Sequence, residues 1–360
     1  MPIARSKILP LGHSPWVHAI SRCVRRAWLL GKGVSHRKAW VEDRLAYLSR
    51  CFAVEIASYA VMSNHLHVVL RLDPAVAASW SAEVVTRRWM SVYPRQYAAD
   101  GSPMVPSDDV IRAQAQDAGW VEQRRKHLAN LGWFMKALKE TIAKRANRED
   151  DCTGSFWEGR FTSVPLLDDA ALLACMAYVD LNPIRAKEVD RPERSRHTGV
   201  RQRIVARQRH RVATRIRATR TPAVAERTLV RDGLVAAEAH PEVGLWLAPL
   251  ARCGVPTTDD QARRRVGRLS AEQYLELVDL SGRMVRNGKR GAIPPALAPI
   301  LARLDVDAQA WVATLFGVRS FMGRAVGAFA ERTAQAGRLG LQWIKNRCPL
   351  FHGEVRERAA

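Results

Sequence analysis

Apolar residues recur along this chain with two different periods, and each period predicts a different kind of element. Alternation of period two is typical of a half-buried strand, whereas recurrence at three and four residues is typical of an amphipathic helix. The patterns predict, in order, an extended segment within 17–30, a helix over 36–50 capped by Ser35, strands over 54–62 and 65–72, a helix over 131–147, a strand within 154–164 and a helix over 169–182.

That order is the split β-α-β pattern of a ferredoxin-like fold, an α+β architecture whose antiparallel sheet carries its helices on one face. We expect this domain to span residues 1–190, with residues 76–130 as a helical insertion. Residues 223–360 contain amphipathic patterns, notably over 270–286 and 308–321, and no strong strand pattern. We expect a mostly helical C-terminal accessory domain there.

Two histidines open the strand predicted over 65–72. Since alternate residues of a strand point to one face, His65 and His67 project together, while Leu66, Val68 and Leu70 point to the core. In a sheet with helices on one face only, the histidines lie on the open face, where a substrate can bind. With an added oxygen donor, two neutral imidazoles suit Mg²⁺ or Mn²⁺, and Mn²⁺ tolerates the nitrogens better.

The helix predicted over 169–182 supplies an oxygen donor and a hydroxyl. Tyr178 and Asn182 are four residues apart, so they share one face of this helix. Pro183 disfavours helical conformation at the preceding residue, which places Asn182 at the helix end. There Asn182 either ligates a metal or caps the helix, and the two roles are compatible. The Tyr178 hydroxyl is a candidate nucleophile, although the sequence does not identify a base for it.

The charge of the chain points to a polyanionic partner. It has 57 Lys and Arg against 35 Asp and Glu, a formal net charge of +22. A field of this sign attracts nucleic acid by counterion release. The chain contains no run of about 18 apolar residues, so the sequence predicts no membrane-spanning helix. The first ten residues lack the apolar core of a signal peptide, and the six cysteines include no C-x-x-C pair. We expect a cytoplasmic, nucleoid-associated protein that is monomeric or homodimeric.

Residues 191–222 are the most basic part of the chain, with eleven arginines and one acid, Glu193. This composition predicts a linker that is too charged to fold by itself and that orders on a polyanion. Its candidate phosphate contacts are Arg201, Arg203, Arg207 and Arg209.

Further candidate DNA contacts lie in and around the segment GSFWEGRF. Trp157 either stacks on an unpaired base or packs in the core, and Arg160 is a candidate phosphate contact. Glu158 either approaches the metal or forms an ordinary ion pair. Arg185 is a candidate phosphate clamp at the end of the Tyr178 helix, and Arg22 and Arg71 are weaker candidates on strands.

The segments NHLHVVL, GSFWEGRF and AYVDLNPIRA resemble the signature segments of the single-tyrosine HUH transposases, and the last two resemble in particular the REP-associated tyrosine transposases. The resemblance covers about residues 15–190, and YLELVDLSGRMVRNGKRGAIP resembles the tail of longer members. It implies a ferredoxin-like fold, metal-dependent cleavage and joining of single-stranded DNA through a 5′-phosphotyrosine, and recognition of hairpins. His65 and His67 match the metal ligands, Tyr178 the nucleophile and Asn182 the polar third ligand. Residues 76–130 exceed the length found in minimal members.

Two functions follow from these observations. The first is a metal-dependent endonuclease and strand transferase for single-stranded hairpin DNA, and the second is a non-catalytic hairpin-binding protein on the same scaffold. Both predict steep salt dependence of binding, but only the first requires Tyr178 and a metal. A zinc hydrolase is disfavoured, because no third histidine or neighbouring acidic base accompanies His65 and His67.

Overall fold

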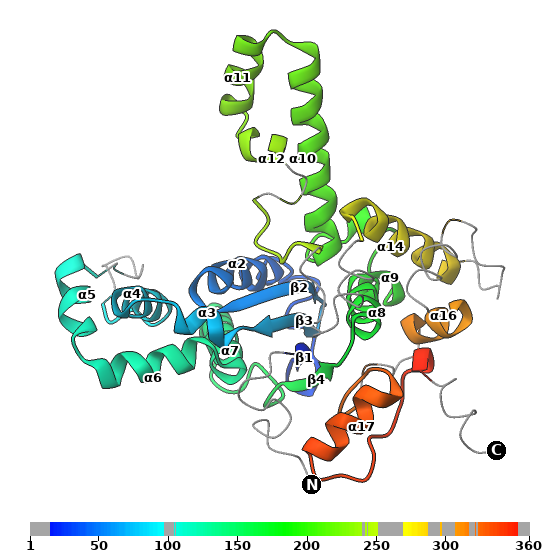
Figure 1. Ribbon diagram of the computed structural model, residues 1–360, viewed down its shortest axis with the longest axis horizontal. Coiled ribbons are helices and arrows are strands. Elements are labelled where there is room, and N and C mark those ends of the chain that lie inside the picture. Colours follow the sequence, from blue (N-terminus) through cyan, green and yellow to red (C-terminus); the bar gives the residue numbers. More distant parts are fainter. Residues whose placement is uncertain are drawn as a thin grey trace.

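The computed structural model describes residues 15–96, 104, 106–239, 242, 244–250, 269–286, 296, 307–316, 321 and 323–351. Its centre is one four-stranded antiparallel sheet surrounded by helices (Figure 1). The strands are β1 (Trp16–Arg22), β2 (Val54–Val61), β3 (His65–Leu72) and β4 (Thr162–Leu166), in the order β2-β3-β1-β4. Among the described helices, none is both long and apolar enough for a membrane span.

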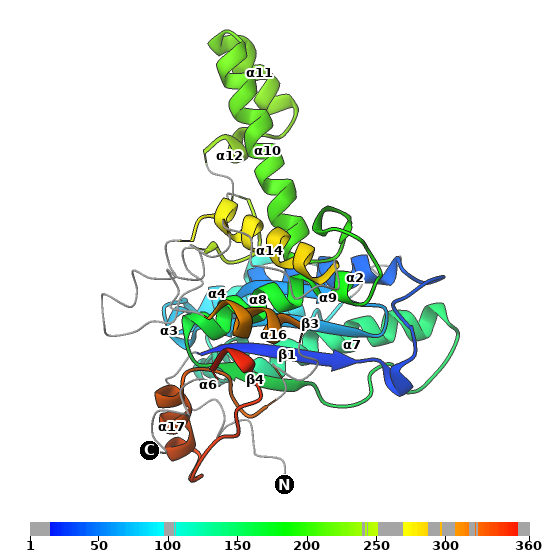
Figure 2. The same cartoon turned by 90° about the vertical axis from the view of Figure 1, so that its right-hand side faces the viewer.

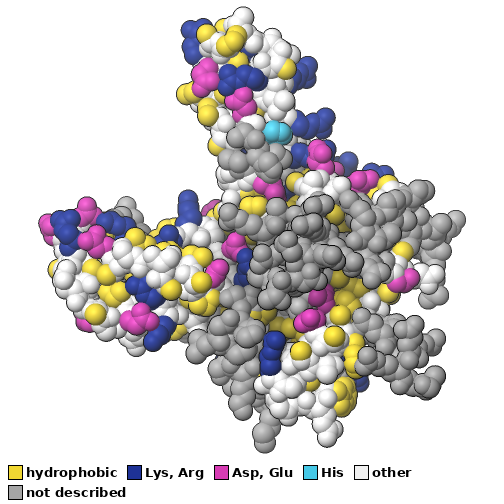
Figure 3. Space-filling view, viewed as in Figure 1, with side chains coloured by type: hydrophobic (Ala, Val, Ile, Leu, Met, Phe, Trp, Pro, Cys, Tyr) yellow, Lys and Arg dark blue, Asp and Glu magenta, His cyan; other side chains and the backbone are white. Residues whose placement is uncertain are grey.

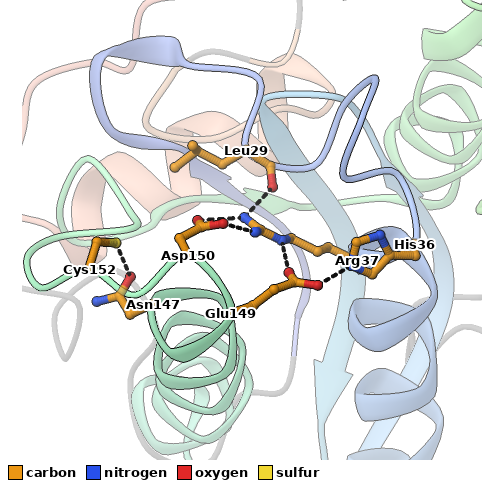
Figure 4. Close-up of polar contacts among 7 residues, drawn as sticks. All are labelled: Leu29, His36, Arg37, Asn147, Glu149, Asp150 and Cys152. Carbon is orange, nitrogen blue, oxygen red and sulfur yellow. Dashed lines mark hydrogen bonds and ion pairs between the residues drawn. The ribbon is translucent and has the colours of Figure 1, made fainter.

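Helices α2 (Arg37–Cys51) and α7 (Leu131–Glu149) cover one face of the sheet. Leu45 of α2, Leu138 of α7 and Leu66 of β3 are fully buried in the same cluster. The alternation along β3 is the predicted one, because Leu66, Val68 and Leu70 all belong to this core. Figure 4 shows how the buried guanidinium of Arg37 joins the two helices. It binds Glu149 at 2.6 Å and Asp150 at the end of α7.

The other face is covered by α8 (Asp169–Asp180), so the expectation that helices lie on one face only is wrong. Every residue of α8 from Ala171 to Asp180 is buried. A helix that is apolar all round requires partners on two sides. The sheet provides one partner, and α14 (Ala271–Arg286) and α16 (Ala308–Phe316) provide the other. These two helices share the core of α8 and the sheet, so residue 190 does not separate two cores.

Asp180 ties this second layer together. Its carboxylate is fully buried and accepts hydrogen bonds from Ser58 Oγ at 2.8 Å, the Val200 amide at 2.9 Å and the Tyr274 hydroxyl at 2.5 Å. Burial raises the pKa of Asp180 to about 6. One side chain therefore connects α8 to β2, to α14 and to the start of the next long helix.

That helix, α10 (Gly199–Thr219), occupies most of the segment for which the sequence predicted a linker, so the prediction of a linker is wrong. The Thr198 hydroxyl caps its N-terminus, and α11 (Pro222–Arg231) and α12 (Val235–Ala239) pack along it. Figures 1 and 2 show these three helices projecting away from the sheet. Ala213, Leu229 and Leu234 form their small core. The arginine-rich segment is helical here because it packs against residues outside 191–222, which the composition of the segment alone does not show.

The described part of 76–130 forms helices at the left of Figure 1, across the molecule from α14 and α16. Together with the preceding helix they are α3 (Pro74–Ala78), α4 (Ala82–Val92), α5 (Asp108–Ala115) and α6 (Ala118–Leu128). Side chains cap all four N-termini, as the preference for Asp and Ser at this position predicts; the caps are Asp73, Ser81, Ser107 and Asp117.

Several boundaries differ from the sequence prediction. The first strand ends at Arg22, and the 3-10 helix η1 (Val24–Arg26) follows it. The α2 helix starts after His36 without any side-chain cap, so the prediction of Ser35 as its cap is wrong. The last strand starts at Thr162, because GSFWEGRF forms a loop. The remaining short elements are α9 (Asn182–Arg185), η2 (Pro192–Arg194), α17 (Phe329–Arg338) and η4 (Pro349–Phe351). The predicted helix over 308–321 is described as far as Phe316, and residues 317–320 lie outside the described residues.

Candidate active site

A pocket of about 500 Å³ lies on the α8 side of the sheet, where β1 ends and β3 begins. Strands, helices α8 and α9, and one residue beyond α16 contribute its walls. The residues that line it are His18, Ile20, Arg22, Arg26, Asn64, His65, His67, Tyr178, Asn182, Arg185 and Phe321. It therefore brings together His65, His67, Tyr178 and Asn182, which are far apart in the sequence.

The two histidines of β3 point into this pocket because they alternate with core residues. Their ring centroids are 4.7 Å apart. The Nδ1 atom of His65 lies 2.6 Å from the side-chain oxygen of Asn64. A carboxamide oxygen only accepts hydrogen bonds, so Nδ1 of His65 carries the proton and its Nε2 keeps a lone pair. Asn64 thus selects the tautomer of His65 that can ligate a cation.

His18 is a pocket residue that the sequence reasoning missed. It is fully buried on β1, and its Nε2 lies 2.8 Å from Nδ1 of His67. That contact occupies Nδ1 of His67 and leaves its Nε2 as the nitrogen available to a ligand. The alternation of WVHAISR was the signal that could have found it, since His18, Ile20 and Arg22 share a face of β1.

All three imidazoles are neutral at pH 7. Burial lowers the pKa of His18 to about 3, and the neighbouring His65 adds to the shift. Burial, followed by the charge of Arg22, lowers the pKa of His65 to about 4. Burial also holds the pKa of His67 well below its ordinary value. Neutral imidazoles have the lone pairs that metal binding requires.

Tyr178 faces the histidines from α8. Its ring centroid is 6.0 Å from that of His67 and 5.0 Å from that of Phe321, and the side chain is 8% exposed. The guanidinium carbon of Arg185 lies 4.8 Å from the centroid of the Tyr178 ring. The Nη1 atom of Arg185 is buried and has no hydrogen-bond partner among the described residues. The pocket thus places a hydroxyl beside a cation that has donors to spare for an anion.

Asn182 lies at the junction of α8 and α9, as Pro183 indicated. Its Nδ2 donates a hydrogen bond to the backbone carbonyl of Tyr178 at 3.0 Å. The side chain therefore caps the end of α8. Because the cap uses the amide nitrogen, the carbonyl oxygen is not consumed by it, and Asn182 retains both predicted roles.

The remaining candidates from the sequence divide between the pocket and other places. Arg22 lines the pocket. Arg71 does not, because it binds Glu55 at 3.0 Å and packs over Trp16. Trp157 is 7% exposed, and its indole donates to the backbone carbonyl of Lys139 at 3.0 Å. Of the two roles considered for Trp157, base stacking and core packing, the structure shows core packing.

The other residues of GSFWEGRF lie outside the active-site pocket. The backbone amide of Glu158 donates to the Arg22 carbonyl at 2.8 Å, but Glu158 is exposed and does not line the pocket. Arg160 is exposed and lines a different hollow.

The four arginines proposed as linker contacts lie on α10 and also outside the pocket. Arg203 is 1% exposed and pairs with Glu242, so its role is structural and the expectation of a DNA contact is wrong there. Arg207 pairs with Glu272 at 2.9 Å. Arg209 donates to the Gly233 carbonyl at 2.7 Å, and Arg201 is half-buried near the capped start of the helix.

The donor set of the pocket fits a divalent cation of the Mg²⁺ or Mn²⁺ kind. Nε2 of His65, Nε2 of His67 and the carbonyl oxygen of Asn182 are the candidate ligands, and all three residues line one cavity. Within the described residues, no group of three or more His, Cys, Asp or Glu is arranged to hold a metal. Two imidazoles and one amide oxygen leave positions for water and for phosphate oxygens.

Comparisons with known proteins yield a single weak likeness. No family model and no curated protein matches the chain. Among solved structures, the chain is similar to the REP-associated tyrosine transposase bound to a REP hairpin, with 12% identity over 51% of this chain and 73% of that chain, and a TM-score of 0.29. A TM-score of that size does not establish a common fold.

Proposed function

We propose that this protein is a metal-dependent endonuclease and strand transferase for single-stranded DNA that acts on hairpins through a 5′-phosphotyrosine at Tyr178. One observation carries the proposal: a tyrosine, two neutral histidines and an arginine with an unpartnered nitrogen line the same pocket. The excess of basic residues suits the substrate. The motifs NHLHVVL and AYVDLNPIRA, which resemble those of single-tyrosine HUH transposases, contain all four of these residues.

The fold assignment has its own support. The chain order β1, α2, β2, β3, α7, β4 and the sheet order β2-β3-β1-β4 are those expected for a ferredoxin-like domain. Helices α2 and α7 lie on one face of that sheet. In this assignment, α8 is an addition that brings Tyr178 to the other face, opposite His65 and His67.

The reaction is a transesterification at phosphorus. The phenol oxygen of Tyr178 forms a bond to the phosphorus as the bond to the 3′ oxygen breaks, the phenol proton passes to water, and the 3′ oxygen gains a proton. Joining is the reverse step, in which a 3′ hydroxyl displaces the Tyr178 oxygen. When bound, a divalent cation supplies positive charge to the scissile phosphate and the leaving oxygen.

The other pocket residues orient the reactants. Arg185 packs on the Tyr178 ring and offers Nη1 to a phosphate oxygen, which aligns the phosphate with the hydroxyl. Asn182 holds the carbonyl of Tyr178 and thereby fixes the end of α8. Phe321 covers one side of the Tyr178 ring and limits its motion.

The test is the covalent intermediate itself. Purified protein is incubated with labelled DNA hairpins that carry single-stranded flanks, with and without Mn²⁺, and separated under denaturing conditions. We expect labelled DNA attached to protein only with the cation present, and mass spectrometry should map the adduct to Tyr178. Tight hairpin binding without any adduct would instead support the non-catalytic binding function.

A further inference from the structure

A second hollow, of about 490 Å³, lies on the face of the sheet opposite the active-site pocket, between α7 and the loop formed by GSFWEGRF. Three cationic side chains line it, namely Lys136, Lys139 and Arg160. Its one acid, Glu140, is bound to Lys144 at 2.6 Å. Lys136 and Arg160 are both exposed. The hollow therefore favours an anionic group such as a phosphate.

A cluster of aromatic rings continues from this hollow onto α6 and α4. Trp133 is next to Gly132 at the edge of the hollow, and the ammonium of Lys136 lies 4.7 Å from its ring centroid. His127 stacks on Trp133 with centroids 4.1 Å apart and planes inclined by 25°. The Trp89 centroid lies 5.5 Å from those of both His127 and Trp133, and the Arg124 guanidinium carbon lies 5.0 Å from the Trp89 centroid.

These rings are only partly buried, so part of each faces solvent. Figure 3 shows hydrophobic, basic and acidic side chains interspersed over the part of the molecule that contains α4–α6. Buried rings would be explained by core packing alone. A partly exposed ring cluster with cations against two of its rings has instead the composition of surfaces that bind unpaired bases by stacking and the backbone by charge.

We propose that the hollow and the ring cluster form a second binding surface for single-stranded DNA. Lys136 and Arg160 hold backbone phosphates, and unpaired bases stack on Trp133 and the rings beside it. This inference rests on the proposed function, because it assigns a place to the single strand that flanks the cleaved phosphate.

The surface is joined to the active-site pocket through the end of β1. Cys23 forms a β-bridge with Trp157, and the Glu158 amide donates to the carbonyl of Arg22 at 2.8 Å. Arg22 lines the active-site pocket, and Arg160, two residues after Glu158, lines the hollow. A strand that leaves the pocket around the end of β1 therefore reaches the hollow along this loop.

The chemistry favours a single strand over a duplex or an acidic peptide. In a duplex the base faces are covered by their neighbours and cannot stack on protein rings. An acidic peptide would use the cations but would gain nothing from the aromatic cluster. Dependence of binding on the bases is therefore the property that distinguishes these ligands.

Binding of labelled oligo(dT) to the full chain is measured by fluorescence anisotropy in EDTA and in the Tyr178→Phe background, together with an abasic strand of the same length. We expect the double variant Lys136→Ala, Arg160→Ala to bind both strands about tenfold more weakly. The slope of log affinity against log salt concentration should become smaller by about 1.4, since each phosphate contact on a single strand contributes about 0.7. The matched control removes two other exposed cations of α7 with Arg145→Ala and Arg148→Ala. It should change affinity less than about twofold.

Trp133→Leu should weaken oligo(dT) about tenfold, because stacking contributes roughly 1–3 kcal/mol per base, and should leave the abasic strand unchanged. Trp133→Phe keeps a ring and should restore most of the affinity. Oligo(dT) with 5-iodouracil should photocrosslink to the peptide that carries Trp133.

Two results would contradict the proposed surface. One is a loss of affinity in the Arg145 and Arg148 control equal to that of the Lys136 and Arg160 variant. The other is equal affinity for abasic and dT strands, with crosslinks confined to peptides that do not carry Trp133. Because these assays need neither metal nor Tyr178, they separate this inference from the proposed function. If the protein cleaves DNA normally but its DNA affinity is unaffected by these substitutions, the second binding surface is refuted and the proposed function is retained.

Discussion

Arginine has opposite roles in the active-site pocket and in helix α10. On α10, the guanidinium of Arg203 binds Glu242 and the backbone carbonyls of Ala57 and Ala248, the latter two at 3.0 and 2.9 Å. Arg217 pairs with Glu226 at 2.9 Å and with Glu238 at 2.7 Å. Arg203 keeps one buried nitrogen, Nε, without a partner among the described residues, but it does not line the active-site pocket. Arg185 lines the pocket, its buried Nη1 has no partner among the described residues, and its guanidinium lies over the Tyr178 ring.

The difference teaches that charge density along a chain does not locate a binding site. The segment 191–222 is the most arginine-rich stretch, yet several of its guanidinium groups are satisfied by the protein's own acids and carbonyls. An ion already paired must lose that partner before it binds phosphate, which reduces the net gain. The pocket has fewer arginines, but Arg185 has a donor to spare.

The largest effect should come from the pocket, where one oxygen atom carries the chemistry. Tyr178→Phe removes the nucleophile but keeps the ring that packs on Phe321, so we expect covalent adduct formation to fall by at least about 10³-fold and hairpin affinity to stay within about threefold. Denaturing gels and anisotropy measure the two quantities. A variant that still forms the adduct would refute Tyr178 as the nucleophile and direct attention to Tyr59, Tyr93 and Tyr97.

The metal ligands should come next. His65→Ala or His67→Ala should abolish Mn²⁺-dependent cleavage, because each removes one of few donors. Asn182→Ala should raise the Mn²⁺ concentration needed for half-maximal cleavage about tenfold, since water can replace an amide oxygen. Chelation should stop cleavage while hairpin binding persists. An unshifted Mn²⁺ dependence in Asn182→Ala would leave Asn182 as a helix cap alone.

Helix α10 should respond in stability and not in chemistry. Arg203→Ala removes the cation that binds the nearly buried Glu242 carboxylate, so we expect the free energy of unfolding to fall by about 3–5 kcal/mol. Arg201→Ala on the same helix should change it by less than about 0.5 kcal/mol. Urea denaturation provides the comparison. An unchanged stability of Arg203→Ala would mean that this buried pair does not hold α10 on the sheet.

A smaller effect on the cleavage rate is expected from substitution of Arg185, which tests whether the pocket arginine acts on the phosphate. Arg185→Ala should lower the cleavage rate about 10–100-fold by removing the group that aligns the phosphate, and Arg185→Lys should recover only part of it, since lysine lacks the planar fork. Single-turnover rates at saturating DNA report alignment separately from affinity. Full activity of the lysine variant would reduce the role of Arg185 to that of a point charge.

The smallest effect should come from the exposed side of α10. Replacing Arg201, Arg207 and Arg209 by alanine should weaken all single strands alike, by about two- to fivefold, because two of these side chains are already bonded within the protein. The slope of log affinity against log salt concentration should decrease by less than the amount expected for the loss of three full phosphate contacts. A loss specific to one DNA sequence would contradict this backbone role.

Local patterns in the sequence were sufficient for much of the fold and part of the site. The strand His65–Leu72, its two faces, the helices beginning at Leu131 and Asp169, and the position of Asn182 at a helix end were all predicted within a few residues. These features depend on alternation, on caps such as Asn130 and Asp168, and on the constraint that Pro183 imposes on its neighbour. Each of these signals acts over a few residues, so each is visible in the sequence.

Only the tertiary structure decided the features that depend on distant partners. Pairing of β1 with β3 brings His18 to His67, and the packing of α14 and α16 on α8 closes the face that the sequence left open. The arginines of α10 pair with Glu242, Glu238 and Glu272, which all lie beyond the arginine-rich segment. The sequence alone determined which residues alternate and where helices begin, because those rules are local. Which arginines are held by the protein itself was decided by the acids that the fold places beside them.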